Sequence, residues 1–206
     1  MYYKNQTSTV HPILFGVPQG SVLGPILFCV YIKALQPSDT SIPCIKYADD
    51  TTFIISADSY ANISEIAVRE INHVDTWCKN YNMQLNKNKT RILFFCNNTL
   101  PQITNSNIIS QYLTKEVNFL GFTLSHNLKW TSHIDRIISK LSSRLHILRI
   151  LKNSLTKKDI IIAYCAYFQS ILDYNFPLSD SFTSKDKSRI QCVINRAHRI
   201  ICDPIC

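Results

Sequence analysis

Residues 44–55 read Cys-Ile-Lys-Tyr-Ala-Asp-Asp-Thr-Thr-Phe-Ile-Ile, two short β-rich runs on either side of an acidic pair. Such runs around a tight polar turn are typical of a β-hairpin, so we expect Asp49 and Asp50 at its tip. Adjacent carboxylates repel one another and are costly to hold beside a core. A divalent cation such as Mg²⁺ would relieve that repulsion, because carboxylate oxygens are its natural ligands. An ordinary solvated turn is the alternative, since Asp favours turns.

Three of the four glycines lie upstream of this hairpin, between Gly16 and Gly24. The stretch 16–25 reads Gly-Val-Pro-Gln-Gly-Ser-Val-Leu-Gly-Pro. Glycine is needed where the backbone takes a positive φ or must approach something closely. The apolar run 26–35 follows, and it predicts a buried helix with Pro25 tolerated in its first turn.

The region after the hairpin shows mixed periodicity. Apolar positions on one face predict a helix over 63–80. Residues 89–95 and 117–124 are predicted strands, the second interrupted by Gly121. Residues 97–111 are polar and poorly patterned, so we expect loop and irregular strand there.

Beyond residue 126 the pattern becomes helical. An apolar stripe from Ile134 to Leu151 predicts one helix, opened by Ser132 and Asp135 as a capping box. Thr156 and Asp159 open a second helix in the same way, and a third is predicted over about 185–201. The expected fold class is α+β: a segment over 1–125 with an antiparallel sheet and flanking helices, then an all-helical segment over 126–206.

The basic surplus lies almost entirely in that helical segment. Residues 1–125 contain 9 Lys and Arg against 8 Asp and Glu, whereas residues 126–206 contain 13 against 6. Such a surplus suggests a polyanionic partner. Arg136, Lys140 and Arg144 are spaced four apart, so they share one face of the predicted helix, away from its apolar stripe. A cationic stripe neutralises phosphates without reading sequence, although a plain solvated face is the alternative.

Nothing in the sequence suggests secretion or a membrane partner. The first residues lack the apolar core of a signal peptide, and the longest apolar run, 160–168, is too short to span a bilayer. The 8 cysteines form no Cys-x-x-Cys pair. We therefore expect buried free thiols in a reducing compartment, and an intracellular protein of the cytoplasm or nucleus.

Five motifs, in this order and spacing, resemble the reverse transcriptases of non-LTR (LINE-type, jockey-like) retrotransposons. Residues 47–50 resemble the catalytic turn of that family, and residues 16–25 match the motif that precedes it almost letter for letter. The others are residues 83–90, similar to the Leu-Asn-x-x-Lys-Thr signature, Phe119-Leu120-Gly121, similar to the primer grip, and residues 130–134, similar to the entry into the thumb. The resemblance implies a partial polymerase palm over 1–125 and a thumb with a post-thumb region over 126–206.

The resemblance also implies roles for particular residues. Asp49 and Asp50 would bind Mg²⁺ (or Mn²⁺), and Lys89 would lie near the triphosphate, where a lysine offsets charge on the leaving pyrophosphate. Pro18, Gln19 and Gly20 would lie beside the incoming nucleotide and the templating base. Phe119, Leu120 and Gly121 would hold the primer end, and Arg136, Lys140 and Arg144 the duplex backbone. The implied partners are an RNA template, a DNA primer and dNTPs.

The chain departs from the family pattern in two places. The residues before Gly16 contain no Asp or Glu, so the strand that bears the first metal-binding Asp of the family is not among them, nor are the fingers. Lys33-Ala34 stands where the family usually has Asn-Asp. We therefore expect an RNA-directed DNA polymerase fragment with an incomplete metal site and no activity by itself. A non-catalytic nucleic-acid-binding remnant and an inert element relic are the alternatives.

Overall fold

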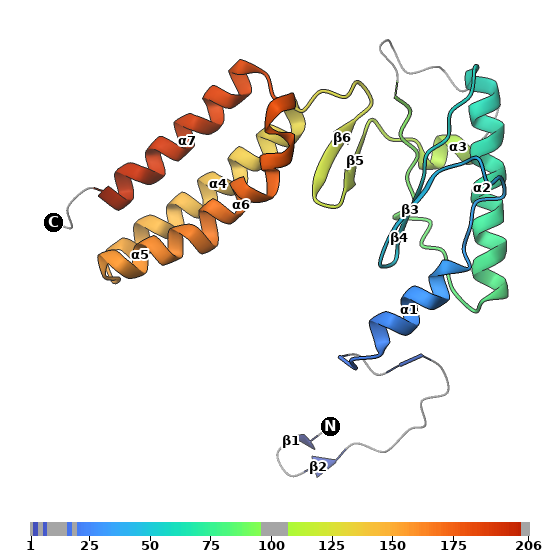
Figure 1. Ribbon diagram of the computed structural model, residues 1–206, viewed down its shortest axis with the longest axis horizontal. Coiled ribbons are helices and arrows are strands. Elements are labelled where there is room, and N and C mark those ends of the chain that lie inside the picture. Colours follow the sequence, from blue (N-terminus) through green and yellow to red (C-terminus); the bar gives the residue numbers. More distant parts are fainter. Residues whose placement is uncertain (1, 4–5, 8–15, 18–19, 96–106, 203–206) are drawn as a thin grey trace. The chain divides into compact units, whose positions relative to one another are not determined.

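The computed structural model describes residues 2–3, 6–7, 16–17, 20–95 and 107–202 (Figure 1). The chain divides into two compact units, Met1–Asn88 and Lys89–Cys206. This division falls upstream of the palm–thumb boundary expected after residue 125, which stays a prediction. Both units mix helices with two-stranded antiparallel sheets, as the expected α+β class requires.

The first unit contains the predicted acidic hairpin. A short pair of strands, β1 (Tyr2–Tyr3) and β2 (Gln6–Thr7), precedes helix α1 (Gly24–Lys33). Strands β3 (Cys44–Tyr47) and β4 (Asp50–Phe53) then pair antiparallel, and helix α2 (Tyr60–Asn80) follows. The hairpin and both flanking helices are confirmed. Helix α2 starts earlier than its apolar periodicity indicated, because the Ser59 side chain caps it by accepting from the Asn62 N–H at 3.2 Å.

The core of the first unit lies where the C-terminal end of α1 meets the C-terminal part of α2. Ile32 and Leu35 pack there against Trp77 and Cys78. The rest of α1 is largely exposed, including Ile26 at 58% and Val30 at 67%. The expectation of a buried helix is therefore wrong for the N-terminal part of α1, because the described core of the first unit packs against its C-terminal end.

The second unit opens without the strand predicted over 89–95. Ile92 forms only an isolated parallel bridge to Leu113, with the Ile92 N–H donating to the Tyr112 carbonyl at 2.8 Å. Helix α3 (Asn107–Tyr112) replaces the loop and strand expected at the end of the 97–111 stretch. Residues 97–106 of that stretch lie outside the described residues.

The strand predicted over 117–124 is instead a complete hairpin. Strands β5 (Glu116–Phe119) and β6 (Phe122–Ser125) pair antiparallel, and Phe119 faces Phe122 across the turn. Leu120 and Gly121 form the two-residue turn, both with positive φ, 46° and 85°. Positive φ at both central residues is the type I′ geometry, which matches the twist of paired strands. Gly121 therefore marks a turn and not an interruption.

Helices make up the rest of the second unit (Figure 1). Helix α4 (Thr131–Lys152) is followed by one continuous helical run, in which α5 (Lys157–Tyr164) passes through a π-helical stretch (Cys165–Gln169) into α6 (Ser170–Asn175). A 3₁₀ stretch (Phe176–Ser181) then leads to α7 (Ser184–Cys202).

Apolar stripes on these helices meet in one core. The predicted stripe of α4 contributes fully buried Ile134, Leu141 and Leu148. Phe168, from the π-helical stretch, and Ala197, from α7, are fully buried in the same cluster. The three predicted helices of this segment are thus confirmed, and their apolar faces are the reason they pack.

The two predicted helix caps have different outcomes. Thr156 caps α5 as expected: its side chain accepts from the Asp159 N–H at 3.3 Å and donates to the Asp159 carboxylate at 2.7 Å. Ser132 is not the cap of α4, because that helix begins one residue earlier and the Ser132 hydroxyl donates to the Glu116 carboxylate. A tertiary contact has replaced the local one.

Cysteine placement only partly agrees with the prediction. All cysteines in the described part of the chain are free thiols, but Cys78 is buried while Cys29, Cys165, Cys192 and Cys202 are exposed. Burial raises the pKa of the Cys78 thiol. Across the described ranges, no helix is both long and apolar enough to cross a membrane.

Candidate functional site

The β3–β4 hairpin presents both acidic residues at its tip. Tyr47 pairs with Asp50, which leaves Ala48 and Asp49 as a two-residue turn. Ala48 has φ 51°, a positive value that resembles the first turn position of a type II′ hairpin. Both carboxylates are exposed. A short turn closed by paired strands therefore places Asp49 in the turn and Asp50 at the start of β4, both exposed to solvent.

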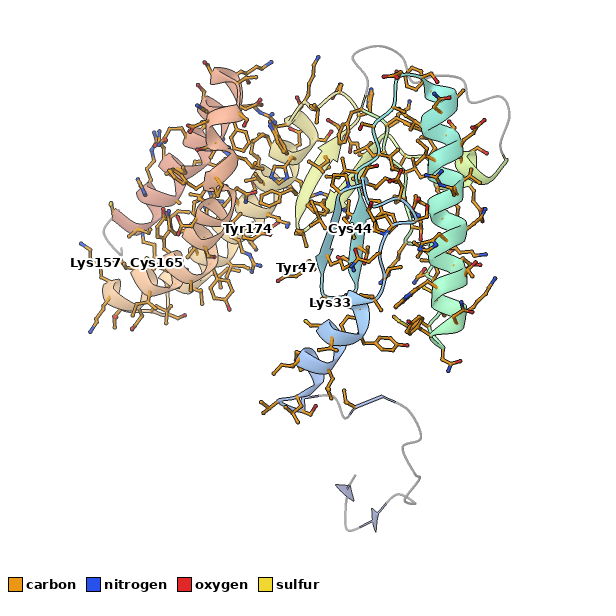
Figure 2. All side chains as sticks on the ribbon, turned by 45° about the vertical axis from the view of Figure 1, so that its right-hand side comes forward. Lys33, Cys44, Tyr47, Lys157, Cys165 and Tyr174 are labelled. Carbon is orange, nitrogen blue, oxygen red and sulfur yellow. The ribbon has the colours of Figure 1, made fainter. Side chains whose placement is uncertain are left out.

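The two faces of this hairpin differ. Residues paired across antiparallel strands share a face, so Ile45, Tyr47 and Asp50 lie on one side and Lys46 and Thr51 on the other. The first face is open, with Ile45 44% and Tyr47 65% exposed; Figure 2 shows the Tyr47 side chain projecting at the end of β3. Asp50 thus lies on an open face beside an aromatic ring, while Asp49 lies in the turn itself.

Lys46 holds the hairpin in place from the opposite face. Its ammonium donates to the Ile32 carbonyl at 3.1 Å and also to the Leu35 carbonyl, at the C-terminal end of α1. Carbonyls in the last turn of a helix have no intrahelical partner, and the helix dipole favours a cation there. Lys46 therefore ties β3 to α1. Sequence reasoning missed this role, although a lysine next to the acidic turn was a visible signal.

The glycine-rich stretch before α1 is only partly described. Pro18 and Gln19, the predicted nucleotide-binding residues, lie outside the described residues. Gly16 and Gly20 both have positive φ, 80° and 84°, as expected for glycines that shape a turn. Gly20 is exposed, with open space where a side chain would begin, which is compatible with close approach by a ligand.

Lys89 and the signature that contains it span the boundary between the two units. Residues 83–88 line a cavity of about 650 Å³ with Asp75, Cys78 and Lys79 of α2. Lys89 begins the second unit, so its predicted place beside the triphosphate stays a prediction.

The predicted primer grip lies at the tip of the β5–β6 hairpin. Phe119 ends β5, and Leu120-Gly121 form the type I′ turn. The Tyr174 hydroxyl, from α6, donates to the Leu120 carbonyl at 2.5 Å, and the Tyr174 ring stacks on Phe122 with centroids 5.1 Å apart. The three residues predicted to hold the primer therefore lie at one turn, and that turn is contacted by α6, a helix far along the chain.

Helix α4 anchors the two strands of the same hairpin. Ser132 bonds Glu116 of β5, and the Arg136 guanidinium donates to the Asn118 side chain. His133 Nδ1 accepts from the backbone N–H of Thr123 in β6 at 3.2 Å. Three side chains in the first turns of α4 thus hold the hairpin against the helices.

The predicted basic stripe lies along α4, at the edge of its buried face. Arg136 and Lys140 are exposed, and Arg144 is partly buried with its guanidinium 5.3 Å from the centre of the Tyr167 ring. Arg189 of α7 does not extend this stripe, because it forms ion pairs with Asp135 at 2.5 Å and Asp186 at 3.5 Å. The α4 stripe is thus the better candidate surface for a polyanion.

The acidic pair Asp49 and Asp50 is the candidate metal-binding feature that the sequence predicted. Asp49 and Asp50 fit the carboxylate chemistry that Mg²⁺ prefers. Within the residues the structure describes, no group of three or more His, Cys, Asp or Glu side chains is placed to hold a metal ion. The metal-binding role of the two carboxylates therefore stays a prediction, and no catalytic step is derived through a metal.

Residues 1–124 match the family model described as reverse transcriptase (RNA-dependent DNA polymerase). The chain belongs to the reverse transcriptase family. It is similar to the RNA-directed DNA polymerase from mobile element jockey of Drosophila melanogaster, with 30% identity over 63% of this chain and 15% of the relative. It is also similar to two probable RNA-directed DNA polymerases of that species, from transposon BS (27% identity, 97% of this chain, 24% of the relative) and transposon X-element (25%, 97% and 23%).

These similarities identify the chain as a jockey-like, non-LTR reverse transcriptase sequence. It spans less than a quarter of the length of these curated relatives. No solved structure matches it significantly.

Proposed function

We propose that this chain forms part of the palm and the thumb of an RNA-directed DNA polymerase that copies element RNA into DNA. The observation that carries the proposal is the tip of the β3–β4 hairpin, where Asp49 lies in the two-residue turn and Asp50 begins β4, both exposed to solvent. A polymerase that uses two metal ions needs such carboxylates where a primer 3′-hydroxyl meets a nucleoside triphosphate. The proposal is also supported by the family match, because the hairpin lies within residues 1–124, which match the reverse transcriptase model.

The other predicted site residues receive roles under this proposal. Asp49 is a metal ligand and Asp50 a more peripheral carboxylate, with Mg²⁺ or Mn²⁺ supplying Lewis-acid chemistry when bound. Gln19 and Gly20 border the nucleotide and the templating base. Lys89 lies by the triphosphate, where its charge favours the leaving pyrophosphate.

The helical segment acts as a thumb on the template–primer duplex. Phe119, Leu120 and Gly121 hold the primer end, while the α4 stripe of Arg136, Lys140 and Arg144 contacts phosphates. Phosphate contacts position a protein on a duplex without selecting sequence. The partners are an RNA template, a DNA primer and dNTPs, and the RNA–DNA hybrid is the surface that the thumb grips.

The test is reconstitution of polymerase activity. The chain is joined to the upstream fingers and palm of the jockey polymerase, and primer extension on an RNA template is measured with Mg²⁺. We expect template-dependent DNA synthesis that Asp49→Asn abolishes and that Asp58→Asn, at an exposed carboxylate downstream of β4, leaves unchanged. A fusion that folds, binds primer–template and still makes no DNA would overturn the catalytic proposal.

A second function is supported by a different observation. The described residues hold a cationic stripe on α4, in which Arg136 and Lys140 are exposed and Arg144 is partly buried, and no group of three or more possible metal ligands. A chain of this kind can bind nucleic acid without catalysis. Salt-dependent binding of the chain to primer–template, in the absence of synthesis by the reconstituted fusion, would favour this second function.

A further inference from the structure

We infer that Tyr174 is a positioning residue that locks the tip of the β5–β6 hairpin, and through it the contact with the primer end. The inference rests on the proposed function only for the identity of the ligand. The lock itself follows from contacts between α6 and the turn.

The turn needs support because of its composition. Leu120 takes φ 46°, a left-handed conformation that bulky side chains rarely adopt. The favoured pair in a type I′ turn is Asn-Gly or Asp-Gly, and Leu-Gly lacks the small polar side chain that tolerates this conformation. The local sequence therefore favours the turn only through Gly121, and an external contact is needed to hold Leu120.

Tyr174 contacts each part of the turn. Its hydroxyl donates to the Leu120 carbonyl at 2.5 Å, across a separation of 54 residues. Its Cε1 would lie 3.3 Å from a Cβ built on Gly121, so its ring covers the glycine and leaves little room for a side chain. The same ring stacks on Phe122 with an interplanar angle of 9°.

These contacts are not ordinary core packing. Tyr174 is 54% exposed and is not a member of the buried cluster of the helices (Figure 2 labels it on this segment). The α4 anchors bond Glu116, Asn118 and Thr123 of the strands, whereas Tyr174 reaches the turn itself. α4 therefore holds the strands of the hairpin, and α6 adds a separate constraint at the turn.

The consequence concerns the primer. If Phe119-Leu120-Gly121 touch the primer end, their backbone must be held at a fixed place relative to the α4 stripe. Tyr174 supplies that constraint from the helical segment that carries the stripe. Loss of the hydroxyl should therefore weaken recognition of the primer end while leaving phosphate binding by α4 intact.

The test uses the whole chain and the variant Tyr174→Phe, which keeps the ring and removes the hydroxyl. Amide hydrogen exchange of Phe119 and Phe122, the pair that closes the turn, should accelerate about fivefold, the effect of one lost hydrogen bond. Exchange in α4 should not change.

Tyr167→Phe is the matched control, because Tyr167 is a similarly exposed tyrosine whose ring contacts Arg144 rather than the turn. Leu120→Asn, which suits a type I′ turn, should restore slow exchange in the Tyr174→Phe background.

Binding measurements then distinguish the positioning role of Tyr174 from the proposed contact of the hairpin with the primer end. Affinity is compared for an RNA–DNA duplex with a recessed primer 3′ end and for a blunt duplex of equal length. We expect wild type to prefer the recessed end, and Tyr174→Phe to lose that preference with an unchanged salt dependence. Unchanged exchange at Phe119 and Phe122 in Tyr174→Phe would overturn the inference. A wild type without end preference would contradict the proposed primer grip instead, and the exchange result would still decide whether Tyr174 holds the turn.

Discussion

His133 Nε2 lies 2.8 Å from the side-chain oxygen of Asn175, inside the helical segment. Because Nε2 donates there, Nδ1 is left to accept from the Thr123 N–H, so the imidazole is neutral. Asn175 in turn donates to the Ile171 carbonyl at 2.6 Å. His133 thus joins β6, α4 and α6, and its protonation would remove the acceptor that β6 needs.

The first prediction follows from this network. Burial is the main reason that the pKa of His133 lies below its usual 6.5, and the positive charges of Arg136 and Lys140 lower it further. The unfolded chain then binds the proton more tightly than the folded chain. The contribution of His133 to the free energy of unfolding should therefore be fully present above about pH 6.5 and be lost as the pH drops toward the folded pKa.

Chemical unfolding of the chain from pH 7.5 to 5 checks this prediction. The slope attributable to one such histidine is at most about 1.4 kcal/mol per pH unit. His133→Gln should flatten the pH dependence, whereas His146→Gln, at an exposed position of the same helix, should preserve it. Equal pH dependence in wild type and His133→Gln would show that His133 does not control stability in this range.

The second prediction concerns catalysis. The chain alone should not extend a DNA primer on an RNA template with Mg²⁺ or Mn²⁺, because under the proposed function Asp49 and Asp50 are only part of the ligands of a two-metal site. Extension is measured with radiolabelled dNTPs, and the reconstituted fusion is the positive control. Synthesis by the chain alone that disappears with Asp49→Asn would prove this prediction wrong.

The third prediction concerns nucleic-acid binding. Each phosphate contact releases condensed counterion, so three contacts from Arg136, Lys140 and Arg144 predict that log affinity falls with log salt with a slope of roughly 3. Replacing all three with Gln should flatten this slope. The buried stripe of α4 is kept, so the helical core should stay folded, while the contacts of Arg136 with Asn118 and of Arg144 with Tyr167 are lost. Binding of an RNA–DNA duplex is measured by fluorescence anisotropy between low and moderate salt.

A matched triple variant controls for net charge. Lys157, Lys158 and Lys187 are exposed on α5 and α7, and their replacement with Gln removes the same charge from other positions. This variant should keep most of the wild-type slope. If both triple variants lower the slope equally, α4 makes no specific contact with the nucleic-acid backbone, and the surplus positive charge attracts the duplex from the whole surface.

The fourth prediction concerns the tie between the acidic hairpin and α1. Lys46→Met removes the ammonium that bonds the Ile32 and Leu35 carbonyls, and should destabilise the first unit by about 1 kcal/mol. Amide exchange should rise at the C-terminal end of α1 and in β3. Lys33→Met, at an exposed position of the same helix end, is the control and should change exchange much less.

The fifth prediction concerns the core of the helical segment. Leu141 is fully buried, so Leu141→Ala should cost about 2–5 kcal/mol of the free energy of unfolding. Ser142→Ala, next to it on the exposed side of α4, should change stability by less than about 0.5 kcal/mol. Urea unfolding of both variants measures the difference, and a Leu141 variant as stable as wild type would contradict the assigned core.

The sequence by itself determined the features whose causes are local. The acidic hairpin was predictable because two β-rich runs flank a two-residue turn, and the helices of the second unit because apolar residues recur at helical spacing. Family membership was also visible in short motifs. The tip of the second hairpin was wrongly predicted as an interruption of one strand, since Leu-Gly is not a strong turn signal. The structure accounts for Gly121 by its positive φ and by the Tyr174 ring, which leaves little room for a side chain.

Only the tertiary structure decided which side chains hold these elements in place. Tyr174 meets Leu120 across 54 residues and His133 meets Asn175 across 42, and no periodicity within one element encodes such pairs. Residues 89–95 fail to form a strand because strand structure requires a partner, and Ile92 gains only a single bridge. Propensity and pattern act over a few neighbours, whereas hydrogen bonds and burial are satisfied by whatever the fold brings close.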